Sequence, residues 1–200
     1  HYFVEEKMKV YFEKTVGGDF KNSLYESAVK ILEAAIIKYH QNLALRTLFS
    51  AEFLKRLTID VENNFEDSKE EYISVGLLTK LVYKRAHFFH NSFAEYFVAL
   101  YFSQNQRLSS IFVDVIFEPR YVNVRFFFDL LLARESPAHV AVLYKNINLL
   151  EKYEHQIRTI TDAGDRSVLH VASSWGQRHP RLDVATTADA YIVDDFDCPN

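Results

Sequence analysis

The sequence contains little that would cross-link the chain or anchor it in a membrane. Of its 200 residues only one is cysteine, Cys198, which excludes an internal disulfide framework and favours a reducing, intracellular setting. No apolar run is long enough to cross a bilayer, because the longest candidate, residues 126–133, is short and is interrupted by Asp129. No signal peptide is recognisable either. We therefore expect a cytoplasmic protein with no membrane partner.

An excess of positive charge is also missing. The formal net charge is −4, and the lysines and arginines are scattered along the chain instead of forming a stripe. What the chain has in quantity is apolar material: 48% of its residues are hydrophobic, including 17 Phe and 12 Tyr. This argues against disorder and is enough for one substantial core or two small domains.

The most informative stretch runs from Ala86 to Phe102. Ser92 precedes Glu95 by three residues, the spacing of a capping box, and this predicts a helix that starts at Ser92. The upstream residues 77–90 are rich in β-branched and aromatic side chains and predict a short hairpin that feeds this helix. Apolar residues follow the cap at helical spacing, which predicts a helix buried on most sides: Phe93, Tyr96, Phe97, Leu100 and Tyr101.

This stretch resembles the end of the winged-helix module in NACHT-type signalling ATPases. The resemblance implies that His90, at the strand-to-helix junction, contacts the phosphates of a bound ADP and senses the nucleotide. An imidazole N–H beside a helix N-terminus is chemically suited to that contact. The alternative is a core or capping histidine without a ligand. The matching positions are Phe88, His90, Ser92, Phe93, Glu95, Tyr96, Phe97 and Ala99.

Helices are predicted on both sides of this stretch. Before it, one helix spans residues 2–15 and ends at Gly17-Gly18, a second starts near Asn22, and Ser50 caps a third; residues 63–71 are a polar loop. After it, the expected helix starts are Ser109-Ser110, Val122, Ser136-Pro137 and Asn148. Residues 103–157 therefore form a helical connector.

Residues 162–176 resemble the opening of an ankyrin repeat. Asp162 and Gly164 are expected to make the turn, Ser167 to cap the helix, and His170 to bond the backbone as a structural residue. Asp195 lies 33 residues after Asp162, the ankyrin period, which indicates a second repeat opening near the end of the chain.

Residues 178–190 lack the apolar stripe expected of the second ankyrin helix, so the repeat is either degenerate or poorly ordered at its end. Repeats are stabilised by their neighbours. Because the sequence also starts at His1 instead of Met, we expect a fragment of a longer protein with more ankyrin sequence beyond it.

No catalytic or metal-binding pattern is present. The sequence lacks a Walker lysine loop and a Gly-x-Ser-x-Gly motif, and Cys198 has no His at helical spacing. His87 and His90 are three residues apart, but the predicted helix starts after them, so they are not expected to share a metal. The chain is not expected to be an enzyme by itself.

The predicted fold is mainly α: a helical bundle with a small winged-helix β-hairpin (1–102), a helical connector (103–157) and the start of an ankyrin-repeat solenoid (158–200). The resemblance implies a non-catalytic part of a NACHT-type switch, in which an upstream NTPase core binds ATP or ADP and the ankyrin array binds other proteins. The alternative is an ankyrin scaffold with an all-α extension and no nucleotide. A nucleic-acid-binding winged helix would need an outward-facing basic helix, and none is evident.

Overall fold

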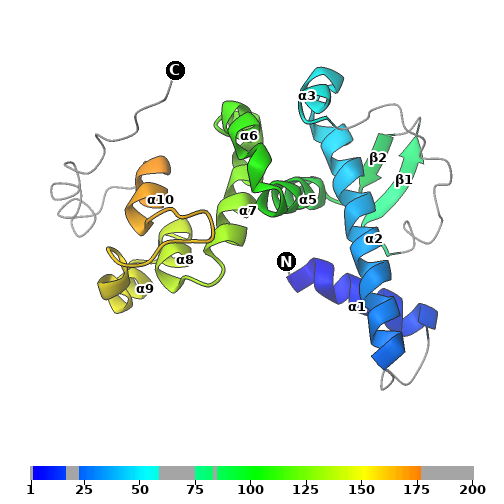
Figure 1. The fold of residues 1–200 in the computed structure, drawn as a ribbon, viewed down its shortest axis with the longest axis horizontal. Coiled ribbons are helices and arrows are strands. Elements are labelled where there is room, and N and C mark those ends of the chain that lie inside the picture. Colours follow the sequence, from blue (N-terminus) through cyan, green and yellow to red (C-terminus); the bar gives the residue numbers. More distant parts are fainter. Residues whose placement is uncertain (1, 17–22, 59–74, 83–84, 177–200) are drawn as a thin grey trace. The chain divides into compact units, whose positions relative to one another are not determined.

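The computed structural model describes residues 2–16, 23–58, 75–82 and 85–176 (Figure 1). These residues are mainly helical, with one two-stranded antiparallel hairpin, so the predicted fold class is confirmed. The chain divides into two compact units, residues 1–128 and 129–200. The expected boundaries at residues 102 and 157 stay predictions.

The first unit carries the hairpin and most of the helices. A long helix at its centre contacts both the hairpin and the following helix. The elements are α1 (Tyr2–Val16), α2 (Ser23–Leu48), α3 (Ala51–Arg56), β1 (Leu78–Val82), β2 (Arg85–Phe88), α5 (Asn91–Gln104), α6 (Ser109–Ile116) and the start of α7 (Val122–Ala133), with 3₁₀ turns at Gln106–Leu108 and Pro119–Tyr121.

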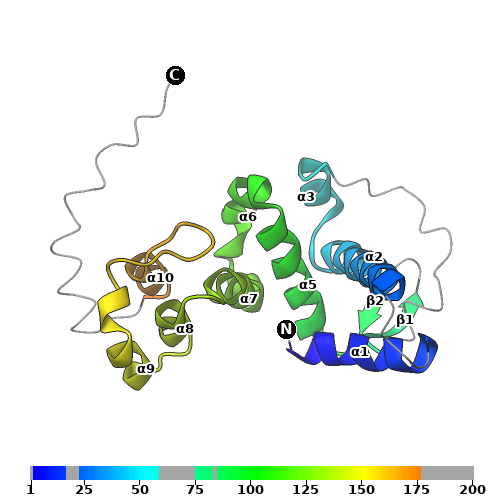
Figure 2. The same ribbon diagram turned by 60° about the horizontal axis from the view of Figure 1, so that its bottom comes forward.

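Helix α5 lies in the core of the first unit. Phe97, Val98 and Ala99 are fully buried, as the all-round apolar pattern predicts. In Figure 2 α5 and the hairpin both lie beside α2, in agreement with the contacts among α2, β2 and α5. Phe102 of α5 stacks on Phe112 of α6 with ring centroids 3.9 Å apart, so α6 packs on the same core. Each such buried aromatic side chain contributes about 2–3 kcal/mol of transfer free energy.

The hairpin is short and irregular. Leu78 pairs with Phe88 and Val82 with Arg85, with a shift of register between Leu78 and Lys80. Beyond the strands, the Phe89 amide still donates to the Leu77 carbonyl at 3.0 Å. This last bond brings the chain to the point at which α5 begins.

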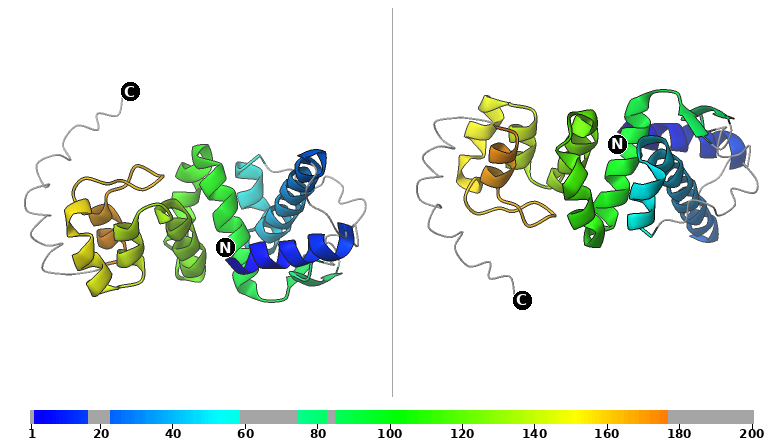
Figure 3. Two further views of the ribbon diagram at one scale, coloured as in Figure 1. Left: turned by 90° about the horizontal axis from the view of Figure 1, so that it is seen from below. Right: turned by 90° about the horizontal axis from the view of Figure 1, so that it is seen from above.

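The second unit is built from the end of α7 and three short helices. These are α8 (Pro137–Leu143), α9 (Ile147–Lys152) and α10 (Val168–Ser174), with a 3₁₀ turn at Glu154–Gln156 between α9 and α10. α8 contacts both α9 and α10, and Figure 3 shows the three helices gathered together. Before α10, Thr161 bridges to Ser167 and closes a tight turn.

Several predicted helix starts are confirmed and two are corrected. Ser50 caps α3, and Pro137 is the first residue of α8. The predicted cap at Ser109-Ser110 is wrong: a 3₁₀ turn runs directly into α6, which begins at Ser109 without a side-chain cap. The cap of α9 is Asn146 instead of Asn148, because its side chain accepts from the Leu149 amide at 3.0 Å. Gly17-Gly18, the loop at 63–71, the segment 178–190 and Asp195 lie outside the described residues.

Candidate functional site

His90 is the N-cap of α5. Its Nδ1 accepts a hydrogen bond from the Ser92 amide at 3.1 Å and lies 2.7 Å from Ser92 Oγ. The predicted capping box of Ser92 and Glu95 is therefore wrong, and the helix begins at Asn91. Glu95 instead accepts from the Asn123 side chain at 3.1 and 3.2 Å. The physical reason is that His90 has extended backbone angles and an acceptor near the orphan amide of the first turn, so its ring takes the position of the cap.

The hydrogen bond from the Ser92 amide shows which ring nitrogen of neutral His90 carries the proton. A backbone amide can only donate, so Nδ1 must be an unprotonated acceptor and the proton sits on Nε2. The side chain is exposed, and Nε2 has no hydrogen-bond partner in the part of the chain that the structure describes. His90 thus presents one N–H donor at the N-terminus of a 14-residue helix, where the helix dipole favours an anion.

A buried histidine supports the junction that carries His90. His40 of α2 is fully buried, and its ring stacks on Phe97 at 5.2 Å and lies 6.4 Å from Phe88. Its Nδ1 donates to the Ile36 carbonyl at 2.8 Å, while the buried Nε2 has no hydrogen-bond partner among the residues that the structure describes. Burial lowers the pKa of His40 to about 4, and the bond to Ile36 offsets this only in part. The sequence pattern does not single out His40, although this residue lies on the apolar face of α2.

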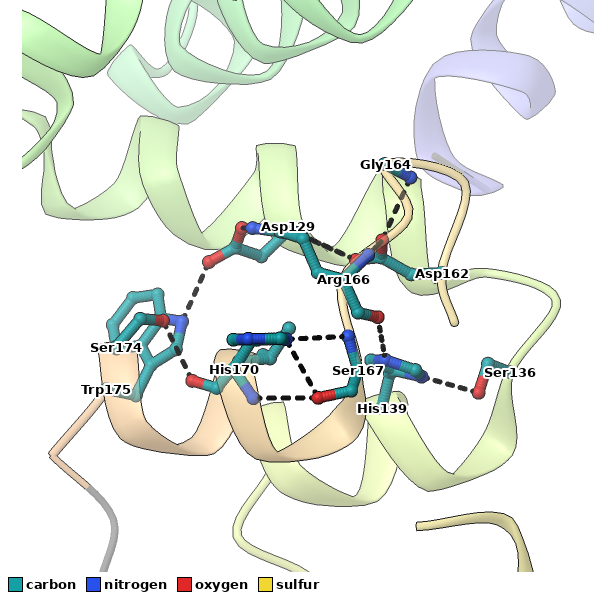
Figure 4. Close-up of polar contacts among 11 residues, drawn as sticks. Asp129, Ser136, His139, Asp162, Gly164, Arg166, Ser167, His170, Ser174 and Trp175 are labelled. Carbon is teal, nitrogen blue, oxygen red and sulfur yellow. Dashed lines mark hydrogen bonds and ion pairs between the residues drawn. The ribbon is translucent and has the colours of Figure 1, made fainter. Parts of the chain in front are cut away.

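A second polar cluster organises the second unit (Figure 4). The Arg166 guanidinium lies between two buried carboxylates, with Nη1 2.5 Å from Asp129 Oδ1 and Nη2 2.7 Å from Asp162 Oδ2. Burial opposes the charge of Arg166, but the attraction of Asp129 and Asp162 outweighs it and raises the pKa of the guanidinium. The remaining Asp129 oxygen accepts from Trp175 Nε1 at 2.8 Å. The cluster therefore joins α7, the turn and the end of α10.

The turn of this cluster is the one that the sequence predicts. Asp162 Oδ1 accepts from the amides of Gly164 and Arg166 at 2.9 and 3.1 Å. A Cβ at Gly164 would lie 3.0 Å from Leu132 Cδ1 and 3.3 Å from Asp162 Oδ1, so the close approach favours glycine there. The predicted turn roles of Asp162 and Gly164 are confirmed.

His139 reaches the same turn from α8. Its Nε2 donates to the Arg166 carbonyl at 2.8 Å, and its Nδ1 lies 2.6 Å from the Ser136 hydroxyl. With the proton on Nε2, the Ser136 O–H donates to Nδ1. Burial lowers the pKa of His139, and the bond to the carbonyl only partly offsets it. The neutral ring therefore fits this site best.

The predicted roles of Ser167 and His170 are confirmed. Ser167 Oγ accepts from the His170 amide at 3.3 Å, and His170 Nδ1 accepts from the Ser167 amide at 3.2 Å, which is a reciprocal capping box. Sequence reasoning missed Asp129, Arg166 and Trp175. For Asp129 and Arg166 the only signal was a charge in a very apolar helix and beside a turn, and nothing in the pattern singled out Trp175.

The comparisons with known proteins add no relative: no family model, no curated protein and no solved structure matches the chain. Within the described ranges, no three His, Cys, Asp or Glu side chains are grouped so that they could hold a metal ion. No helix among the described residues is long and apolar enough to cross a bilayer.

Proposed function

We propose that this chain is a non-catalytic, regulatory part of a cytoplasmic NACHT-type switch ATPase that also carries ankyrin repeats. In this proposal His90 senses the nucleotide. The single observation that carries it is the exposed His90 ring, whose cap to Ser92 leaves the Nε2 proton for an outside acceptor. A phosphate oxygen of ADP, held by the NTPase core of the longer protein, is that acceptor.

The second unit supplies the partner-binding end of the switch in this proposal. Support comes from the turn at Asp162 and Gly164, followed by the capped helix α10, which is how an ankyrin repeat opens. Further repeats would stack on this one and bind other proteins. ATP and ADP belong to the NTPase core, and the chain itself needs no cofactor.

The test is ADP retention by the full-length gene product after gel filtration. His90→Asn keeps an N-cap acceptor but removes the Nε2 donor, whereas His90→Ala removes both. We expect both variants to lose bound ADP at least tenfold faster, with His90→Asn close to wild type in thermal stability. The matched control is His87→Ala, an exposed histidine of β2.

The outcomes separate sensing from capping. If only His90→Ala loses ADP, together with stability, His90 acts as a cap and not as a sensor. If neither variant changes ADP retention, the proposal fails and the second candidate remains: an ankyrin scaffold without nucleotide dependence. The observation that favours the second candidate is the Arg166 cluster, which satisfies its carboxylates from within the second unit.

A further inference from the structure

A groove lined by both polar and apolar groups lies between α2 and α5. It encloses about 630 Å³, within the range of small-ligand sites. Both helices belong to the first unit and pack against each other (Figure 2). Each contributes three residues with polar side chains at i, i+3 and i+4 spacing, which places them on one face of its helix. They are Lys38, Gln41 and Asn42 from α2, and Tyr101, Gln104 and the C-cap residue Asn105 from α5.

Gln41 is the buried member of the groove. Its side chain is 5% exposed, and its Nε2 donates to Gln104 Oε1 at 2.9 Å. Its Oε1 makes no hydrogen bond to any residue whose position the structure describes. This oxygen is not one of the fully buried side-chain atoms, so it stays open to a donor that a ligand brings into the groove.

The other amides are also only partly used. Asn105 Nδ2 donates to the Tyr101 carbonyl at 2.8 Å, which leaves its Oδ1 as an acceptor. Gln104 keeps its amide N–H donors after accepting from Gln41. Asn42 has no hydrogen-bond partner within the described parts of the chain. Side-chain amides offer the same donor and acceptor pair as a peptide group, so this set is suited to pair with a peptide main chain.

The charge of the groove restricts the charge that a ligand can carry. Of the described residues that line it, Lys38 alone is charged, and no carboxylate neutralises it there. One ammonium matches one carboxylate, whereas the several charges of a nucleotide would call for more cations. Ala34 and Ile37 add a small apolar surface beside Lys38. A single anion next to peptide groups and one apolar side chain is the composition of a peptide C-terminus.

We propose that this groove binds the C-terminal end of a peptide. The Lys38 ammonium pairs with the terminal carboxylate, and Ile37 and Ala34 contact the last side chain. The amides of Gln41, Asn42, Gln104 and Asn105 pair with the main chain, in the manner of backbone-directed peptide capture. This inference does not depend on the nucleotide role of His90.

The test is an NMR titration of the ¹⁵N-labelled 200-residue chain. The probe is a pool of N-acetylated tetrapeptides with free C-terminal carboxylates, compared with the same pool as C-terminal amides. We expect the side-chain NH₂ signals of the four groove amides to shift and saturate with the free-acid pool. Binding of the amidated pool is expected to be at least tenfold weaker.

Variants connect the effect to the groove. Lys38→Met is expected to weaken binding of the free-acid pool about tenfold, whereas Lys30→Met, an exposed lysine of α2 outside the groove, leaves it unchanged. Both lysines are exposed, and unchanged ¹⁵N spectra confirm that the variants fold. The proposal is overturned if the free-acid pool causes no shifts, if both pools bind equally, or if AMP shifts these signals and the peptides do not.

Discussion

The carboxylate of Asp129 in α7 accepts a hydrogen bond from the indole of Trp175, 46 residues later in the chain. Asp129 is 2% exposed and also pairs with Arg166. Two groups that are distant in sequence therefore meet on one buried carboxylate. This relationship makes Asp129 the residue on which the polar cluster of the second unit depends.

Asp129→Asn is expected to destabilise the chain by about 2–4 kcal/mol. The amide keeps the shape of the side chain but removes the negative charge from a half-buried Arg166. Urea unfolding followed by the fluorescence of Trp175, the single tryptophan, measures the change. The control is Asp114→Asn, which breaks an exposed ion pair with Arg56 and should cost less than about 1 kcal/mol. Equal losses in the two variants would contradict the assignment.

Ser167→Ala is expected to cost about 1 kcal/mol, because it removes the hydroxyl that caps α10. Ser110→Ala is the matched control, since α6 has no side-chain cap and the change should cost almost nothing. Midpoints of urea unfolding compare the two variants. If Ser110→Ala lost as much stability as Ser167→Ala, Ser110 would cap α6 as the sequence predicted.

Phe112→Ala is expected to cost about 3–5 kcal/mol, because it opens a cavity beside the stacked ring of Phe102. Phe117→Ala in the same part of the chain should cost less than about 1 kcal/mol, because Phe117 is 60% exposed and its ring contacts the Arg125 guanidinium at the surface. Thermal unfolding measures both. A small loss for Phe112→Ala would mean that the α5–α6 contact contributes little to stability.

Stability is expected to fall as the pH drops from about 6.5 to about 4. His40 has a pKa of about 4 when folded and about 6.5 when unfolded, so the unfolded chain binds more protons between these values. The free energy of unfolding therefore rises with pH in this window. The contribution of His40 reaches its full value above about pH 6.5. The contribution of His40 is about 3 kcal/mol.

His40→Phe separates this contribution from that of other groups. The variant should lose most of the pH dependence between pH 6.5 and 4, as measured by urea unfolding at each pH. The lowered pKa of His139 acts in the same direction and leaves a smaller slope. His87→Phe, at an exposed position, should keep the wild-type slope. A His40→Phe slope equal to that of wild type would contradict the burial of a neutral imidazole.

Features whose partners are close in sequence were predictable. The turn at Asp162 and Gly164 and the capping box of Ser167 and His170 involve residues at most three apart, so the residue types alone specify the hydrogen bonds. Helix positions followed from apolar spacing for the same reason, as with α7. The choice between two neighbouring caps was harder to predict. Both His90 and Ser92 can cap α5, and the extended backbone at His90 favours its ring.

The sequence by itself determined the helices, the hairpin and the turn before α10, because these depend on contacts within a few residues. Only the tertiary structure decided which polar groups are buried and with whom they pair. His40 becomes neutral because α2, β2 and α5 enclose it, and Arg166 is held because Asp129 approaches from 37 residues away. The physical reason is that desolvation and charge pairing depend on distance in space, which a pattern of neighbouring residues does not contain.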